Sequence, residues 1–291
     1  MSHQGSQDQL HGQRQARPGH HQGVGAAHEG VLDHRQQIRE VHRGGVAEAD
    51  HAPDLVGVRG RGTPADDVVD VGNHREPDLE AIVAAKPDLV INGQRFTQHE
   101  AKLKELAPDA AFLNLDPREG EPLDTELKRQ TDVLGEVFGK EAEATRLGKD
   151  LDAQVARVKK AYQPGDTVMA INTSGGELGY IAPTVGQTFG PVFDLFDLEP
   201  ALEVEGASDD HQGDEVSVEA IAESQPDIIL VMDRDAAVAA DEEGFQPAAE
   251  IIEKSEALKD VPAVKNGHVY YMPKDTYVNE GIQTYTEFLK A

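Results

Sequence analysis

Hydrophobic and polar positions follow the same order in two segments of the chain. Residues 78–91 read DLEAIVAAKPDLVI, and residues 217–230, which lie 139 positions further on, read SVEAIAESQPDIIL. In each copy a polar N-cap residue precedes a short amphipathic run, a proline ends it, and a continuous apolar run follows. Such apolar runs are typical of strands buried on both faces of a parallel sheet. The repeat therefore predicts a helix–strand unit in each of two similar α/β lobes.

A long stretch with helical periodicity, from about Pro122 to Tyr162, separates the two copies. Its apolar residues recur mostly at spacings of three and four, and Pro164-Gly165 ends the pattern. About 40 residues of continuous helix would extend about 60 Å, which is too long for one small lobe. We therefore expect one long linking helix between two lobes, with the N-terminal lobe at residues 71–121, the linking helix at 122–163 and the C-terminal lobe at 164–291.

Within the C-terminal lobe, short apolar runs alternate with amphipathic segments. The expected strands are residues 168–171, 178–182, 228–232 and 268–272. The expected helices are residues 190–196, 217–224, 247–258 and 281–289. This alternation implies a mostly parallel sheet, so the predicted fold class is α/β, with two lobes of mostly parallel sheet.

The first 70 residues differ in composition from the rest. Eight of the twelve histidines lie in residues 1–60, whereas the first lysine is Lys86 and the first aromatic residue is Phe96. A segment this poor in apolar side chains buries too little surface to offset its chain entropy. Three interpretations stay open for residues 1–70: a disordered tail, a product of out-of-frame translation, or a His-rich metal-binding arm. The N-terminal lobe is accordingly expected to be partial.

Charge and cysteine content restrict the possible functions. The chain has 54 acidic and 27 basic residues and no cysteine. The absence of cysteine excludes disulfides and thiolate chemistry, and the net negative charge argues against nucleic-acid binding. The sequence has no nucleophile elbow, phosphate loop, zinc-protease motif or dinucleotide-binding glycine pattern. We therefore predict a binding protein without an intrinsic cofactor, and not an enzyme.

Several motifs in residues 71–291 occur together in a known family. They are EPDLEAI and KPDLVI in the first half, and QTFGPVFDLF, VMDRDAA and VKNGHVYYMPKDTY in the second. With these motifs, residues 71–291 resemble the helical-backbone solute-binding proteins of ABC importers, in the branch that carries ferric siderophores of the catecholate type. The resemblance implies a monomer that captures a ferric siderophore between its lobes and delivers it to a permease dimer. It also implies an extracytoplasmic location, although neither an export signal nor a lipobox cysteine is present in this sequence.

Arginines are the natural partners of an anionic siderophore, because the planar guanidinium hydrogen-bonds oxygen and stacks on aromatic rings. Arg95 and Arg234 each follow a repeat strand within a few residues, at the end where open α/β sheets bind ligands. The resemblance implies ligand contacts at both positions. Three other arginines fall on the helical stretch and are interpreted as solvated helix charges, namely Arg129, Arg146 and Arg157.

One arginine that the resemblance implies is absent. The matching segment here contains Gln187 and Thr188, which can donate hydrogen bonds but supply no charge. The substitution weakens the prediction of a highly anionic ligand or indicates a different siderophore.

His211 and Tyr277 match the family's iron-ligating histidine and tyrosine, according to the same resemblance. Imidazole nitrogen and phenolate oxygen are suitable donors for Fe(III), and they would be needed when a siderophore fills only four of the six iron positions. The competing interpretations are a loop histidine and a tyrosine packed at the edge of the lobe. Tyr180, in an expected strand, either lines the cleft or packs in the core, and core packing is favoured.

Glu80 and Glu219 occupy the same place in the two repeats, near the start of each helix. Carboxylates at that end are stabilised by the helix dipole. The resemblance adds a second role, in which one acidic residue on each lobe docks on arginines of the permease.

Alternative functions stay open at this point. A haem, cobalamin or hydroxamate-siderophore carrier would use the same two arginines for carboxylates or amides. A metal-handling protein would instead depend on the His-rich N-terminal arm. A chain with an incomplete first lobe would bind nothing.

Overall fold

The structure is a computed structural model that describes residues 55–56, 68–72 and 77–291. The chain divides into two compact units, Met1–Leu113 and Asn114–Ala291, and each is described by itself. The predictions for residues 1–54 and 57–67, including the His-rich metal-binding arm, lie outside the described residues.

The first unit contains two small sheets and two α-helices in its described part. β1 (Leu55–Val56) pairs in parallel with β2 (Val68–Val69), upstream of the position where the N-terminal lobe was expected to begin. β3 and β4 form the other sheet. The elements that follow β2 are α2 (Leu79–Ala85), β3 (Leu89–Asn92), the 3-10 helix η2 (Gln94–His99), α3 (Glu100–Leu106) and β4 (Ala111–Asn114).

The predicted helix–strand repeat is confirmed down to its end caps. The Asp78 carboxylate accepts a hydrogen bond from the backbone N–H of Ala81 at 2.9 Å, and the Ser217 hydroxyl accepts one from Ala220 at 3.1 Å. Both helices end in a left-handed residue just before the proline, with φ of 50° at Lys86 and 48° at Gln225. The second copy comprises α7 (Val218–Glu223) and β9 (Ile228–Met232).

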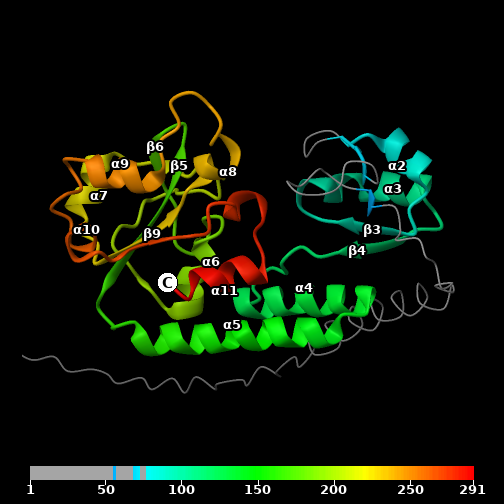
Figure 1. Ribbon diagram of the computed structural model, residues 1–291, viewed down its shortest axis with the longest axis horizontal. Coiled ribbons are helices and arrows are strands. Elements are labelled where there is room, and N and C mark those ends of the chain that lie inside the picture. The colour runs from blue at the N-terminus through cyan, green and yellow to red at the C-terminus, as the bar shows by residue number, and fades with distance from the viewer. Residues whose placement is uncertain (1–54, 57–67, 73–76) are drawn as a thin grey trace, which may run out of the picture. The chain divides into compact units, whose positions relative to one another are not determined.

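The prediction of one continuous linking helix is wrong. Residues 122–162 form two helices, α4 (Leu123–Phe138) and α5 (Glu141–Ala161), which pack side by side (Figure 1). Gly139 ends α4 in the left-handed conformation, with φ of 62°. A Cβ built on Gly135 would lie 2.7 Å from the Cβ of Ala144. The two glycines thus permit a tight helical hairpin, which belongs entirely to the second unit.

One mixed sheet forms the centre of the second unit. Its strand order is β10-β9-β5-β6-β8, and β7 pairs with the first residues of β5. β10, β9, β5 and β7 are parallel, whereas β6 pairs antiparallel with β5 and β8. The predicted mostly parallel sheet is therefore confirmed. The strand bounds are β5 (Thr167–Ser174), β6 (Glu177–Tyr180), β7 (Glu199–Pro200), β8 (Asp214–Glu215) and β10 (Val269–Tyr271).

Helices cover both faces of this sheet (Figure 1). Successive residues of β5 alternate between the faces, so that Val168 and Ala170 pack on one side and Met169 and Ile171 on the other. The first face is covered by α4, α5, α6 (Gly190–Phe196) and α11 (Ile282–Phe288). The second is covered by α7, α9 (Ala248–Lys254) and α10 (Pro262–Asn266).

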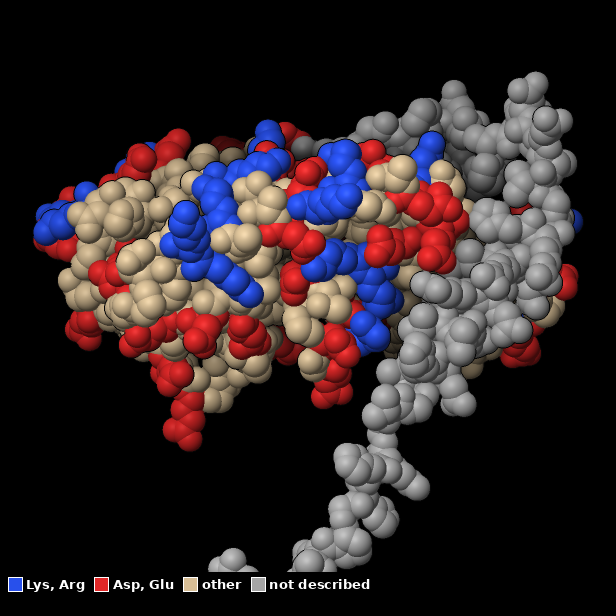
Figure 2. Space-filling view, turned by 90° about the horizontal axis from the view of Figure 1, so that it is seen from below, with Lys and Arg blue, Asp and Glu red and all other residues tan. Residues whose placement is uncertain are grey.

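Charged residues on the helical hairpin play more than one role. On the face shown in Figure 2, which includes α4 and α5, basic and acidic side chains are interspersed. Arg146 is exposed and pairs with Glu143 and Asp150, as a solvated helix charge should. For Arg129 that interpretation is wrong, because it is mostly buried and, together with Arg118, binds the buried carboxylate of Glu126.

Glu126 in turn connects α4 to the segment that precedes it. Burial raises the pKa of Glu126, but the hydrogen bonds from Arg118 and Arg129 outweigh this effect. The net pKa is about 2. Arg157 also has a structural contact, since it donates to the carbonyl of Leu289 beyond α11. Among the described residues, no helix is both long enough and apolar enough to cross a membrane.

Candidate functional site

The candidate site lies at the carboxyl edge of the parallel strands of the second unit. β5, β9 and β10 run in the same direction, so their last residues meet at one edge. Arg234 is the first residue of α8 (Arg234–Val238), two residues beyond the end of β9. Tyr277 lies in the 3-10 helix η3 (Thr276–Val278), a few residues beyond β10. The topology therefore brings together two side chains that are 43 positions apart in sequence.

Arg234 and Tyr277 are in direct contact. The guanidinium carbon lies 4.9 Å from the centroid of the Tyr277 ring, which is a cation–π distance. The Arg234 side chain is 17% exposed, and its NH1 lies 3.4 Å from a carboxylate oxygen of Asp235. Its Nε is buried and has no hydrogen-bond partner among the described residues. A buried donor without a partner costs free energy, so this side chain is held in place by its other contacts.

His211 completes the group. It lies in the turn before β8, and its ring centroid is 6.4 Å from that of Tyr277. Its Nδ1 is 3.7 Å from the Asp210 carboxylate, and its side chain is 32% exposed. The buried amide of Asn172, on β5, donates to the backbone carbonyl of His211 at 3.3 Å. The structure thus places Arg234, Tyr277 and His211, all predicted from the sequence, next to one another.

Thr188 and Gln187 are positioned differently from each other. Gln187 is exposed, whereas Thr188 is buried with φ of 67°. The Thr188 hydroxyl donates to Glu280 at 3.4 Å, and the hydroxyl of Tyr285 donates to the Thr188 carbonyl at 2.9 Å. The Thr188 side chain is therefore engaged inside the protein, and a ligand contact is more accessible to Gln187.

Glu280 supplies a carboxylate beside Thr188. Although the residue as a whole is exposed, its carboxylate contacts the buried Tyr285 hydroxyl. Desolvation raises the pKa of Glu280, and the hydrogen bonds from Tyr285 and Thr188 oppose this shift. No pattern in the sequence singled out this residue.

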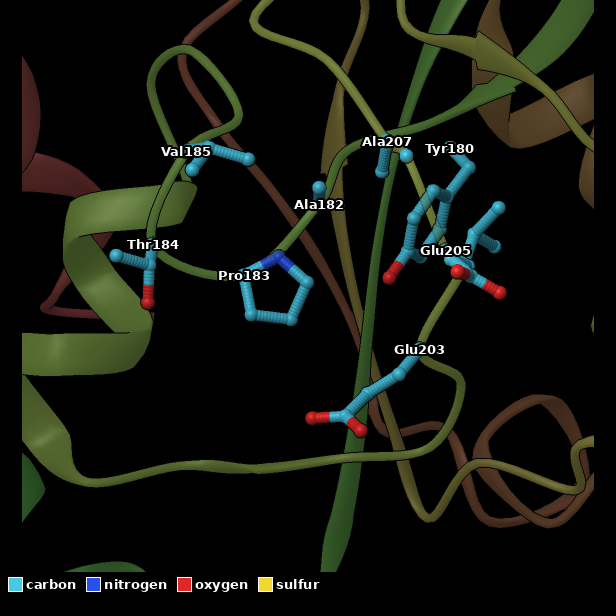
Figure 3. A pocket seen from close by; sticks show the side chains of 10 residues that line it. Tyr180, Ala182, Pro183, Thr184, Val185, Glu203, Glu205 and Ala207 are labelled. Atoms are coloured by element: carbon cyan, nitrogen blue, oxygen red, sulfur yellow. The ribbon is translucent and has the colours of Figure 1, made fainter.

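Tyr180 packs in the core, as the sequence favoured. It is 2% exposed, and its hydroxyl donates to the carbonyl of Leu202 at 2.7 Å. Burial is the main cause that raises its pKa to about 12. Its ring also forms part of the wall of a hollow of about 530 Å³ (Figure 3). Glu203 and Glu205 line this hollow and no basic side chain does, so it is unsuited to an anionic ligand.

The predicted residues of the repeats lie at equivalent positions. Glu80 and Glu219 are each the second residue of their helix, and both are exposed. Arg95 lies in η2, three residues after β3, and its side chain is outside the described part of the structure.

The turn between β5 and β6 contains the glycines of the Thr173-Ser174-Gly175-Gly176 run. Gly175 and Gly176 have φ of 64° and 83°, as a tight hairpin turn of this kind requires. Their N–H groups donate to the Asp235 carboxylate at 3.2 and 2.8 Å, so they do not form a phosphate site. Asp235 was missed in the sequence, where its only signal is its place beside Arg234.

The described region contains no cluster of three or more His, Cys, Asp or Glu side chains able to hold a metal ion. The site residues offer instead one imidazole, one phenol and one guanidinium, which suit an anionic complex that brings its own metal.

The sheet, its two helical layers and this edge define a solute-binding protein, and sequence comparison agrees. The chain belongs to the periplasmic binding protein family, whose model matches residues 43–276. The match begins upstream of Val71, where the first family-like motif occurs.

Particular relatives carry siderophores according to their names. The chain is 28% identical, over 228 residues, to the petrobactin-binding protein YclQ of Bacillus subtilis, a match that covers 77% of this chain and 68% of YclQ. The crystal structure of YclQ matches with a TM-score of 0.60 and covers 77% of this chain and 75% of that one. The catecholate-siderophore binding protein VctP of Vibrio cholerae matches with a TM-score of 0.63 at 25% identity, covering 78% of this chain and 77% of VctP. A TroA-like periplasmic binding protein of Xylanimonas cellulosilytica matches with a TM-score of 0.62 at 31% identity, covering 77% and 75%.

Proposed function

We propose that this protein is the solute-binding component of an ABC importer and captures a ferric siderophore that contains catecholate groups. The observation that carries the proposal is the contact of Arg234 with Tyr277, with His211 beside them, at the carboxyl edge of the sheet. The names of the relatives YclQ and VctP support the ligand class. The protein delivers its ligand unchanged and is not an enzyme.

Arg234 supplies the charge that this ligand class requires. A ferric catecholate complex is an anion, whereas the chain carries a net charge of −27, so a local cation must act against the general field. The Arg234 side chain is mostly buried, where a charge-assisted hydrogen bond is stronger than at the surface. The part of the Arg234 side chain that stays exposed is where a catecholate oxygen would be met. In the other lobe, Arg95 is proposed to contact the ligand as well.

His211 and Tyr277 coordinate the iron directly when the siderophore leaves coordination positions open. Their ring centroids are 6.4 Å apart, a separation that allows an imidazole nitrogen and a phenol oxygen to approach one metal ion. With a hexadentate siderophore they would act only as walls of the site.

The proposed partner is a membrane permease dimer, and the proposed location is extracytoplasmic. The protein would act as a monomer, without nucleic acid and without an intrinsic cofactor. Glu80 and Glu219, exposed at matching helix starts, are the proposed docking residues. Gln187, which is exposed, is the proposed neutral contact that replaces the missing arginine.

Replacing Arg234 by alanine tests the ligand class. We expect affinity for a ferric catecholate to fall by about 10- to 150-fold, the usual cost of losing a charge-assisted contact. Arg146→Ala is the matched control, because Arg146 is exposed and pairs only along its own helix. Binding is measured by tyrosine fluorescence, since the chain has no tryptophan. Equal affinities for the two variants would remove Arg234 from the site, and a wild-type protein that binds no ferric catecholate would refute the proposed ligand.

Replacing Tyr277 by phenylalanine tests iron ligation. With a tetradentate ferric siderophore, we expect a phenolate-to-iron charge-transfer band that disappears in Tyr277→Phe. Tyr271→Phe is the control. This partly buried tyrosine on β10 packs on the sheet face covered by α7, α9 and α10, whereas Tyr277 packs against the core of the other face. A band that survives in Tyr277→Phe would assign the oxygen ligand to another residue.

A further inference from the structure

The residues on either side of Arg234 form a buried hydrogen-bond network with the end of β5. Asp235 is 4% exposed, and its carboxylate accepts the N–H groups of Gly175 and Gly176 at 3.2 and 2.8 Å. Its own backbone N–H donates to the Thr173 hydroxyl at 3.3 Å, and that hydroxyl donates to Asp233 at 2.9 Å. The network thus connects α8 to the β5–β6 hairpin through residues about 60 positions away.

Asp233 caps the same N-terminal end of this short helix. One of its oxygens caps α8 at the N–H of Ala236, at 3.0 Å, and the other accepts the N–H of Ala248 at the start of α9, at 2.8 Å. α8 has only five residues, too few to be stable by itself. The position of Arg234 in space is therefore determined by the two aspartates that flank it.

The surroundings of the Asp235 carboxylate compensate for its burial. Burying a carboxylate is costly unless hydrogen bonds and an opposite charge compensate for the lost water. Two glycine N–H groups supply the hydrogen bonds, and the Arg234 guanidinium, 3.4 Å away, supplies the charge. The Tyr277 ring contacts the same guanidinium at 4.9 Å. Asp235 and Tyr277 thus restrain Arg234 together, while its Nε keeps no partner among the described residues.

We propose that Asp235 is a positioning residue, which fixes the Arg234 guanidinium against Tyr277 by clamping the Gly175-Gly176 turn, and so presents Arg234 to an anionic ligand. This inference rests on the proposed function of Arg234. An asparagine at position 235 could accept only one of the two glycine N–H groups and would carry no charge to pair with Arg234. Asp235→Asn should therefore weaken the restraint without changing the volume of the side chain.

A double-mutant cycle with Arg234 tests the proposal. Asp235→Asn should weaken binding of ferric tris-2,3-dihydroxybenzoate by about 5- to 15-fold in the wild-type background and by less than about 2-fold in the Arg234→Ala background. Asp227→Asn is the matched control, because Asp227 also joins β9 to β5 by accepting a backbone N–H, that of Thr167 at 2.9 Å, but at the first residue of β5. It should lower the thermal midpoint and leave affinity unchanged.

A measurement without ligand separates this proposal from the proposed function. In tyrosine-labelled protein, Asp235→Asn should shift the ring resonances of Tyr277 when Arg234 is present and leave them unshifted in Arg234→Ala. Thr173→Val, which removes the hydroxyl between the two aspartates, should act in the same direction, and Thr173→Ser should restore the wild-type spectrum. If the wild-type protein binds no ferric catecholate, the proposed function is wrong. The Tyr277 resonances would still show whether Asp235 positions Arg234. Equal effects of Asp235→Asn in both backgrounds, or no shift at Tyr277, would overturn the proposal.

Discussion

The two copies of the repeat have the same local geometry but different burial. Before each helix, a polar side chain accepts a hydrogen bond from the backbone N–H three residues further on. After each helix, a residue in the left-handed conformation precedes a proline. Yet Ile221 in the second copy is 0% exposed, whereas its counterpart Ile82 is only half-buried. Similarly, Ile91 of β3 is 47% exposed and the matching Leu230 of β9 is 7% exposed.

The difference lies in what surrounds each copy. β9 lies between β5 and β10 in the large sheet and is covered by helices on both faces. In the described part of the first unit, β3 pairs with β4 in a sheet of two strands. Capping and turn formation depend on residues within a few positions, whereas burial depends on elements far away in sequence. Similar local patterns therefore produce similar helix ends, but burial differs between the two copies.

Truncating the matched isoleucines should reveal this inequality most strongly. Ile221→Ala should destabilise the second unit by about 2–5 kcal/mol, because it leaves a cavity between α7 and the sheet. Ile82→Ala should cost about 1 kcal/mol, since less of its side chain leaves water on folding. Hydrogen exchange of peptides that cover each helix and the following strand measures the two losses separately.

Leu89→Ala and Ile228→Ala form a second matched pair, at the first residue of each strand, where both side chains are half-buried. Their losses should be similar to each other. If Ile82→Ala costs as much as Ile221→Ala, the first unit is packed as tightly as the second, and the comparison drawn above is wrong.

The repeat also shows how far the sequence leads for the fold. Helix and strand positions in the second unit follow from apolar periodicity, and α6 and β9 begin and end where they were expected. The periodicity of residues 122–162 continues through the turn at Gly139, because both helices of the hairpin bury an apolar face at the same spacings. Gly139 ends the first helix, and the missing side chain of Gly135 allows the two helices to approach closely.

For the site, the sequence identifies the residues that would touch a ligand but not those that hold them. Arg234, Tyr277 and His211 stand beside strand ends and in recognisable motifs, and the structure brings them together. Asp235 and Asn172 act through partners about 60 and 39 positions away, and local patterns carry no information about such pairs. The buried state of Thr188 likewise depends on contacts with Glu280 and Tyr285 across the fold.

The smallest expected effect concerns Glu80 and Glu219, where the two copies remain most alike. Both are exposed at the second position of their helix, so their shared helix-dipole role should stabilise each helix by only about 0.3–1 kcal/mol. If they also dock on a permease with one basic pocket for each lobe, reversal of either charge to lysine should leave siderophore affinity unchanged and reduce stimulation of the transporter's ATPase.

Charge reversal is more informative here than neutralisation. An exposed ion pair contributes less than about 1 kcal/mol, so Glu219→Gln should reduce stimulation only slightly, whereas Glu219→Lys adds repulsion from the permease arginines. Glu223→Lys is the matched control, since it places the same charge on the last turn of α7. ATPase stimulation is measured with the permease in liposomes over a range of binding-protein concentrations, because weaker docking raises the concentration needed for half-stimulation. Normal stimulation by the double variant Glu80→Lys and Glu219→Lys would show that the likeness of the two copies at this position reflects helix stability alone.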